Sequence, residues 1–189
     1  MIKSYLGWSV AVAALTLLTA GPALAQATGG SAPAAFPATS FLTPAKATWE
    51  STRALVLGIA EIFPEDKYDF KPTPTVRSLR ENLIHLIGEN YFFFSKVTGE
   101  TLPSNARFNE LKSRDEILKE LRASYDYDAK AWDTLTEAKA QELVEGRNNQ
   151  KVQRWSFILG AIQDNMNHYG NLVVYARLNG LVPPRSAGR

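Results

Sequence analysis

Residues 152–184 have the sequence VQRWSFILGAIQDNMNHYGNLVVYARLNGLVPP, and this stretch decides the fold. Apolar side chains recur in it every three or four positions, which is the period of an α-helix with one buried face. The stripe consists of Trp155, Ile158, Leu159, Ile162, Met166, Tyr169 and Val173. The Asn-Gly pair at 179–180 and the Pro-Pro pair at 183–184 are stop signals. The stretch therefore predicts a long amphipathic helix over residues 152–178.

Three earlier segments also have helical signals. Residues 44–62 carry apolar side chains at helical spacing and end before Pro64. The next helix begins at Thr75 or Ser78 and ends near residue 98. A third helix over residues 113–134 begins with a capping box, Ser113 with Glu116.

No segment shows the sustained alternation of a strand, and residues 136–149 are predicted to be a polar connection. Four amphipathic helices joined by loops of moderate length are typical of an all-α protein. We therefore predict an antiparallel four-helix bundle.

The first 25 residues have the features of a secretory signal peptide. Lys3 provides the positive start, residues 6–20 form an apolar run that is too short for a membrane span, and Ala-Leu-Ala precedes Gln26. We expect cleavage before Gln26, so that the protein is periplasmic or secreted and has no membrane anchor afterwards. Residues 26–43 are predicted to be a flexible linker, residues 44–184 the bundle and residues 185–189 a tail.

Composition excludes several kinds of function. The chain has no cysteine, so it has no disulfide and no thiolate chemistry of its own. Of the 21 basic residues only Lys3 lies in the leader, which leaves 20 basic against 19 acidic residues in the mature chain. That balance gives no reason to expect nucleic acid as a partner.

The chain has two histidines, His85 and His168, and they lie on different predicted helices. Asp164 is four residues before His168, so both side chains lie on one face of the last helix and can approach one ion. Helical geometry places this face roughly opposite the apolar stripe of that helix, and His85 is likewise predicted away from the stripe of its own helix. If the faces meet, two imidazoles and a carboxylate form a metal site with open positions. Spacing alone leaves open that each histidine is only hydrogen-bonded at the surface.

Two further sets of polar residues lie on the predicted helices. Glu89 lies one turn after His85 and is a metal ligand, a hydrogen-bond acceptor for an imidazole N–H, or a surface charge. The cluster of Asp126, Asp128 and Lys130 is interpreted most simply as a solvated helix face.

Two stretches carry a resemblance to a known family. YDFKPTPTVRSL at residues 68–79, followed by His85, resembles the start of the second helix of DinB-like proteins. Residues 167–184, NHYGNLVVYARLNGLVPP, resemble that family's last helix and the segment that follows it. The resemblance extends in order and spacing from about Pro44 to Pro184. It implies a four-helix bundle of up-down-down-up topology and a homodimer.

The resemblance also implies a divalent metal held by one histidine of the second helix and two of the last helix, spaced four apart. His85 and His168 match two of these positions, and Asp164 stands where the common pattern has histidine. An aspartate ligand shifts the preference from zinc or nickel towards iron or manganese. The substitution alternatively marks a bundle that has lost its metal.

Some relatives are thiol-dependent transferases or hydrolases. The resemblance thus implies an exported metal-binding protein with His85, Asp164 and His168 as ligands, acting on a small-molecule substrate as a transferase or hydrolase. The alternative is a non-catalytic binding or dimerisation module with a degenerate metal site.

Overall fold

A computed structural model describes residues 36–102 and 105–188. The predicted signal peptide, residues 1–25, and the first part of the predicted linker lie outside the described residues. Helix α1 begins at Leu42, two residues before the predicted start. Phe36, in the predicted linker, packs edge-on against Trp132, with 6.3 Å between the ring centroids.

Four long helices dominate the described residues: α1 (Leu42–Glu61), α2 (Leu79–Thr98), α3 (Arg114–Thr134) and α5 (Trp155–Leu178). Capping boxes at Ser78 and Ser113 begin α2 and α3, because each serine accepts a hydrogen bond from the backbone three residues on while that residue's glutamate bonds back. Of the two predicted starts for α2, Ser78 is confirmed and Thr75 is wrong. Gly99 ends α2 in the left-handed conformation at φ 86°.

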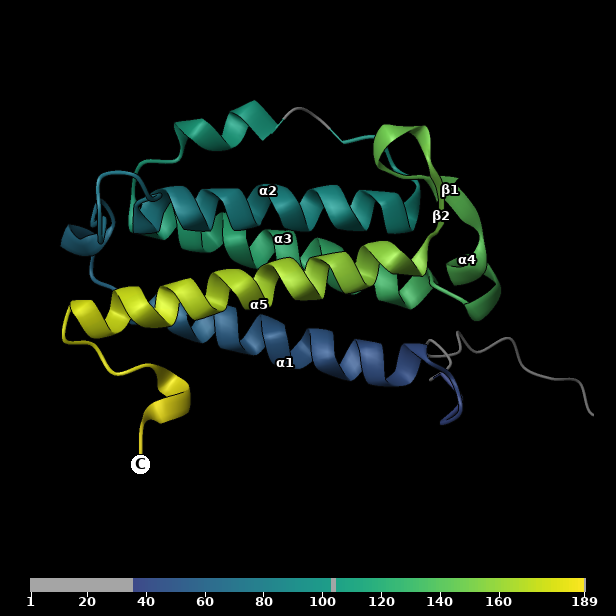
Figure 1. Ribbon diagram of the computed structural model, residues 1–189, viewed down its shortest axis with the longest axis horizontal. Helices are drawn as coiled ribbons and strands as arrows, with labels where there is room; N and C mark the ends of the chain where they lie inside the picture. The colour runs from purple at the N-terminus through teal and green to yellow at the C-terminus, as the bar shows by residue number, and fades with distance from the viewer. Residues whose placement is uncertain (1–35, 103–104, 189) are drawn as a thin grey trace, which may run out of the picture. The chain divides into compact units, whose positions relative to one another are not determined.

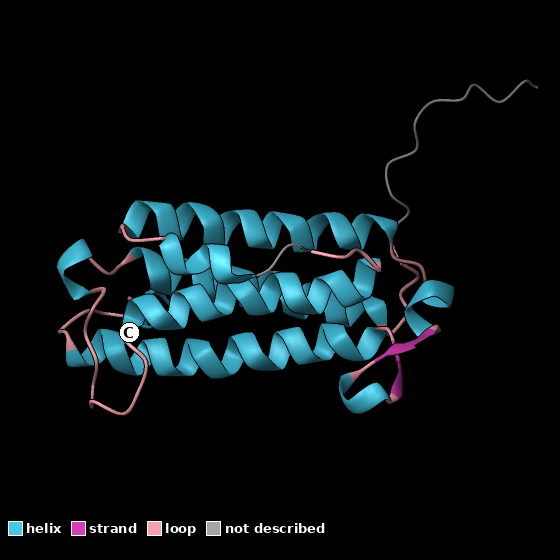
Figure 2. Ribbon diagram, turned by 90° about the horizontal axis from the view of Figure 1, so that it is seen from above, coloured by secondary structure: helices cyan, strands magenta, loops and turns pink. Residues whose placement is uncertain are grey.

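The connection before α5 differs from its prediction. It contains a short helix α4 (Glu137–Gln141) and an antiparallel pair of strands, β1 (Leu143–Glu145) and β2 (Lys151–Gln153), at one end of the bundle (Figure 2). The expectation that no strand occurs was therefore wrong here, and Val152 belongs to β2 rather than to the helix. Strands of three residues are too short to show alternation in the sequence. The single-turn helices are η1 (Glu65–Lys67), η2 (Asn105–Glu110), η3 (Arg147–Asn149) and η4 (Pro184–Ser186).

The helices form a bundle in which α2 packs against α3 and α5, and α1 packs against the same two helices. Figure 1 shows α1 and α5 running in one direction and α2 and α3 in the other, which is the up-down-down-up topology. The connection from α2 to α3 therefore returns along the bundle, and its η2 turn packs on α2. The predicted all-α bundle is confirmed.

The contact between α2 and α5 is close at Gly160. A Cβ atom at this position would lie 2.7 Å from Phe93 Cε1 on α2, so only glycine admits the ring. This approach brings the facing polar residues of the two helices within reach of each other.

Burial on α5 extends beyond the predicted stripe: Ile158 and Tyr169 of the stripe are buried, and so are residues of another face. Leu159 is 48% exposed, whereas His168 is only 5% exposed and lies on that other face. The reason is that α5 packs against both α1 and α2, so two of its faces are covered. The predicted position of His168 opposite the stripe is correct, but a single apolar stripe implies one buried face, so the burial of His168 was not predicted. Among the described residues, no helix combines the length and apolar character needed to cross a membrane.

Asp128 on α3 corrects another expectation. The sequence suggested a solvated face, but Asp128 is fully buried and neither carboxyl oxygen has a hydrogen-bond partner. Burial raises the pKa of this carboxyl well above its ordinary value of 3.8, and the nearby Trp49 indole and Arg53 charge lower it less. The folded protein therefore holds Asp128 as the neutral acid where the unfolded chain ionises it.

We predict that Asp128 lowers stability as pH rises. Its folded-state pKa is above its unfolded-state pKa. The contribution of Asp128 to the free energy of unfolding is therefore fully present below pH 3.8. Above that pH it is lost by about 1.4 kcal/mol per pH unit until the folded-state pKa is reached. Asp128→Asn removes this dependence, and denaturant unfolding should show its advantage over the wild type growing with pH. The exposed Asp133→Asn serves as the control. A wild-type-to-variant difference that does not change between acidic and neutral pH would contradict the prediction.

Candidate metal centre

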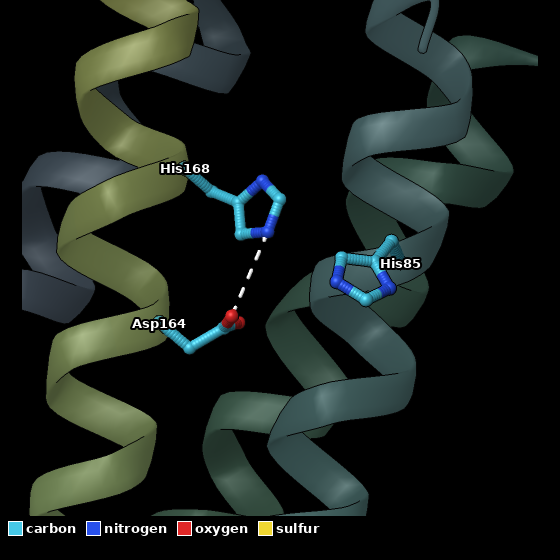
Figure 3. A group of neighbouring side chains, drawn as sticks. All are labelled: His85, Asp164 and His168. Atoms are coloured by element: carbon cyan, nitrogen blue, oxygen red, sulfur yellow. Dashed lines mark ion pairs between the residues drawn. The ribbon is translucent and has the colours of Figure 1, made fainter. Parts of the chain in front are cut away.

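The three predicted site residues lie together between two helices. His85 comes from α2, while Asp164 and His168 come from successive turns of α5, and the side chains point into the same space (Figure 3). One ligand atom from each residue lies within 4.8 Å of the others. The imidazole rings are 4.8 Å apart between centroids and are inclined at 64°.

Asn82 fixes the orientation of His168. The Asn82 amide nitrogen donates to the Ser78 carbonyl at 3.1 Å and to the Tyr175 hydroxyl at 3.3 Å, which leaves its oxygen facing His168 Nδ1 at 3.2 Å. An amide oxygen can only accept, so Nδ1 carries the hydrogen of the neutral ring. His168 Nε2 therefore presents a lone pair.

That lone pair faces Asp164. The distance from His168 Nε2 to Asp164 Oδ1 is 3.6 Å, and Oδ2 is buried without a hydrogen-bond partner. Burial is the main cause that lowers the pKa of His168 to about 4, aided by the charges of His85 and Arg77, so the ring is neutral at pH 7. Two electron-pair donors then face each other with no hydrogen between them.

Burial also raises the pKa of the Asp164 carboxyl above its ordinary value. The positive charges of His85, Arg77 and Arg147 oppose the rise without cancelling it. A carboxyl that is partly removed from water and has an unpartnered oxygen gains free energy from a nearby cation.

His85 is the more exposed imidazole. Its Nδ1 lies 4.0 Å from Glu89 Oε1, beyond hydrogen-bond distance. The cluster of potential ligands contains His85 but not Glu89. Glu89 is therefore a neighbour of the centre rather than one of the three converging residues.

The donor set fits a divalent metal ion. Ligands of a tetrahedral ion at about 2.1 Å are about 3.4 Å from one another. The Asp164–His168 pair, at 3.6 Å, is already close to this separation. His85 must approach by up to about 1.4 Å, and its partial exposure leaves room for that movement. Two nitrogens and one carboxylate oxygen leave further coordination positions open.

A buried network of polar side chains ties together the three helices next to the centre. Asn165 donates to Asn90 Oδ1 at 2.9 Å and accepts from the Tyr125 hydroxyl, and Asn90 donates to Ser124 Oγ at 3.0 Å. Such networks select one arrangement of the helices because a buried amide is costly without its partners.

Sequence reasoning missed these residues, although a signal was present. An asparagine lies three positions before each histidine, Asn82 before His85 and Asn165 before His168. An amide one turn from a histidine marks a polar helix face, and here each amide bonds a side chain of the facing helix rather than the histidine of its own helix.

Two pockets flank the centre. The His85 pocket, of about 570 Å³, lies between α2 and the η2 segment and includes Arg80, Glu81, Glu89 and Lys112. The His168 pocket, of about 550 Å³, lies between α5 and the loop before α2. It is lined by Pro72, Thr73, Thr75, Val76, Arg77, Asn82, Asn167, His168, Asn171, Val174 and Tyr175. Small molecules thus have access to each imidazole from a different side.

Comparisons with known proteins give a family match and two similar folds. The family model described as the DinB superfamily matches residues 48–172. The fold is similar to crystal structures of a DinB-like protein from Bacillus subtilis, with TM-score 0.60 and 19% identity, and of another from Bacillus cereus, with TM-score 0.66 and 13% identity. Each likeness covers 74% of this chain and 93% of the other. Among curated proteins, no match was found.

We predict that His168 is protonated at Nδ1 in the metal-free protein at neutral pH, which nitrogen NMR of labelled imidazoles can measure. Asn82→Ala removes the acceptor, so the ring is free to move its hydrogen to Nε2 and donate to Asp164. Asn167→Ala, on the neighbouring position, should leave the tautomer unchanged. A wild-type ring protonated at Nε2 would show that Asn82 does not orient it.

Proposed function

This chain belongs to the DinB superfamily, and on that basis we propose that it binds one divalent metal ion between α2 and α5. His85, Asp164 and His168 are the proposed ligands. One observation carries the proposal: the neutral His168 Nε2 and Asp164 Oδ1 face each other at 3.6 Å, while the second Asp164 oxygen is buried without a partner. A cation bound between these atoms would accept a lone pair from each of them.

The ligand set favours particular metals. Two imidazoles with one carboxylate are a harder and more negative set than three imidazoles. We therefore propose iron or manganese ahead of zinc or nickel for this member of the superfamily. Asp164 stands where the resemblance implies histidine, so we attribute this metal preference to the aspartate.

We propose a metal-dependent transferase or hydrolase as the activity. A divalent metal in such a site acts as a Lewis acid and lowers the pKa of bound water or thiol. The protein's part is to position the reactants: Asn82 holds the His168 ring, and the two pockets admit small molecules to either imidazole. If the predicted leader is cleaved, this chemistry takes place in the periplasm or outside the cell.

Metal analysis tests the proposal directly. The protein, purified without a histidine tag and loaded with manganese, iron or zinc, should hold one ion per chain. His85→Ala and His168→Ala should each weaken binding by at least about a hundredfold, since losing a ligand costs more than losing its supporting hydrogen bond. Asp164→His should retain or strengthen the binding of zinc.

The exposed Asp133→Asn is the matched carboxylate control and should bind metal as the wild type does. Circular dichroism checks that each variant keeps its helices. If no loading condition gave a stoichiometric ion, the metal proposal would fail, and the non-catalytic module would be the better account of this bundle.

A further inference from the structure

The His168 pocket has the dimensions of a small-molecule site. Its volume of about 550 Å³ lies within the usual range of ligand pockets, roughly 300–1,000 Å³. One wall is fixed, because the Tyr175 hydroxyl donates to the Arg77 carbonyl at 2.6 Å and Phe70 packs edge-on against the Tyr175 ring. The pocket therefore exists before any ligand arrives.

The charged side chains that line this pocket are basic only. Arg77 is the one arginine or lysine among the residues that line the pocket, and none of these residues is acidic. Among the ion pairs of the described residues, none involves Arg77. The influence of this charge reaches the centre, since it contributes to the lowered pKa of His168. Asp164 of the centre feels this charge but is not part of the pocket lining and forms no ion pair with Arg77, so the guanidinium is available to attract an anion from solvent.

The His85 pocket lacks this character. Its Arg80 is paired with Asp69 at 2.8 Å, and Glu81 and Glu89 are part of its lining. An anion entering there meets two glutamates together with Arg80, which is already paired, and Lys112, whose Nζ donates to the Asn109 carbonyl at 2.9 Å. The contrast identifies the His168 side as the anion-binding side of the centre.

The donors available select the type of anion. The first backbone N–H groups of α2 are already used: Leu79 N donates to the Phe70 carbonyl, Arg80 N to the Tyr68 carbonyl and Glu81 N to Ser78 Oγ. These three N–H groups at the start of α2 are therefore not free to hold a phosphate. One guanidinium, assisted by the side chains of Asn167 and Asn171, matches the single charge and two oxygens of a carboxylate.

The same pocket also offers apolar surface. Val76 and Val174 line it, and both are exposed to solvent in this structure. A ligand that covers them gains hydrophobic free energy in addition to its ion pair. The complementary molecule thus has an apolar body and one carboxylate.

We propose that the His168 pocket binds a small organic monocarboxylate, with Arg77 holding the carboxylate and the valine side chains covering the apolar body. The inference rests on the proposed function in that it names the substrate class of the metal centre. Arg77 specifies the anion, and the rest of the molecule is thereby placed beside His168.

Benzoate and benzamide are suitable probes because they share a shape and differ in charge. NMR titration of the metal-free protein should show benzoate binding about fivefold more tightly than benzamide, as expected for an ion pair with an exposed arginine. In Arg77→Gln the two affinities should become equal. Arg177→Gln, an exposed arginine of α5 outside this pocket, should keep the wild-type preference.

The titration separates this inference from the proposed function. His85→Ala, which removes a proposed metal ligand but no residue of the pocket, should keep the preference for benzoate. The inference is overturned if benzamide binds as tightly as benzoate, if neither probe binds at millimolar concentration, or if Arg77→Gln keeps the preference. Each of these results is independent of whether the protein holds a metal.

Discussion

Hydrogen bonds between buried amides of α2 and the facing side chains of α5 align the two helices on which the site is built. Asn82 meets His168, and Asn90 meets Asn165, each across the interface. Buried amides without partners cost free energy, so sliding α5 along α2 is penalised at both pairs. The alignment that satisfies them is the one that sets His85 opposite Asp164 and His168. The geometry of the proposed metal centre thus follows from polar contacts in which His168 is the one ligand that takes part.

The two raised carboxyl pKa values of the bundle differ in meaning. Asp128 is fully buried, has no hydrogen-bond partner, and lies in no cluster of potential ligands among the described residues. Asp164 is only partly buried, faces the lone pair of a neutral imidazole and lies near His85 and the charges of Arg77 and Arg147. Burial is the main cause of the shift in both cases, but only Asp164 has neighbours that would share a cation with it. The electrostatic surroundings, rather than the shift itself, mark the functional carboxyl.

Sequence patterns predicted the long helices because capping and stop residues act locally, as at Ser78, Ser113 and Gly99. The ligand trio was predicted because helical spacing joins Asp164 to His168, and a family resemblance joined both to His85. The burial of His168 was missed, since it depends on which helices cover α5. Asp128 was placed on the surface for the same reason. The β1–β2 hairpin was too short to leave a periodic signal, and the role of Asn82 required knowing what lies across the interface.

The central claim is that one divalent ion is shared by α2 and α5. Anomalous diffraction from crystals of protein loaded with manganese locates the ion directly. The account predicts one peak between the helices, about 2.0–2.2 Å from a nitrogen of His85, His168 Nε2 and an oxygen of Asp164. Absence of a peak at this position, or a peak that His168 or Asp164 does not ligate, would contradict it.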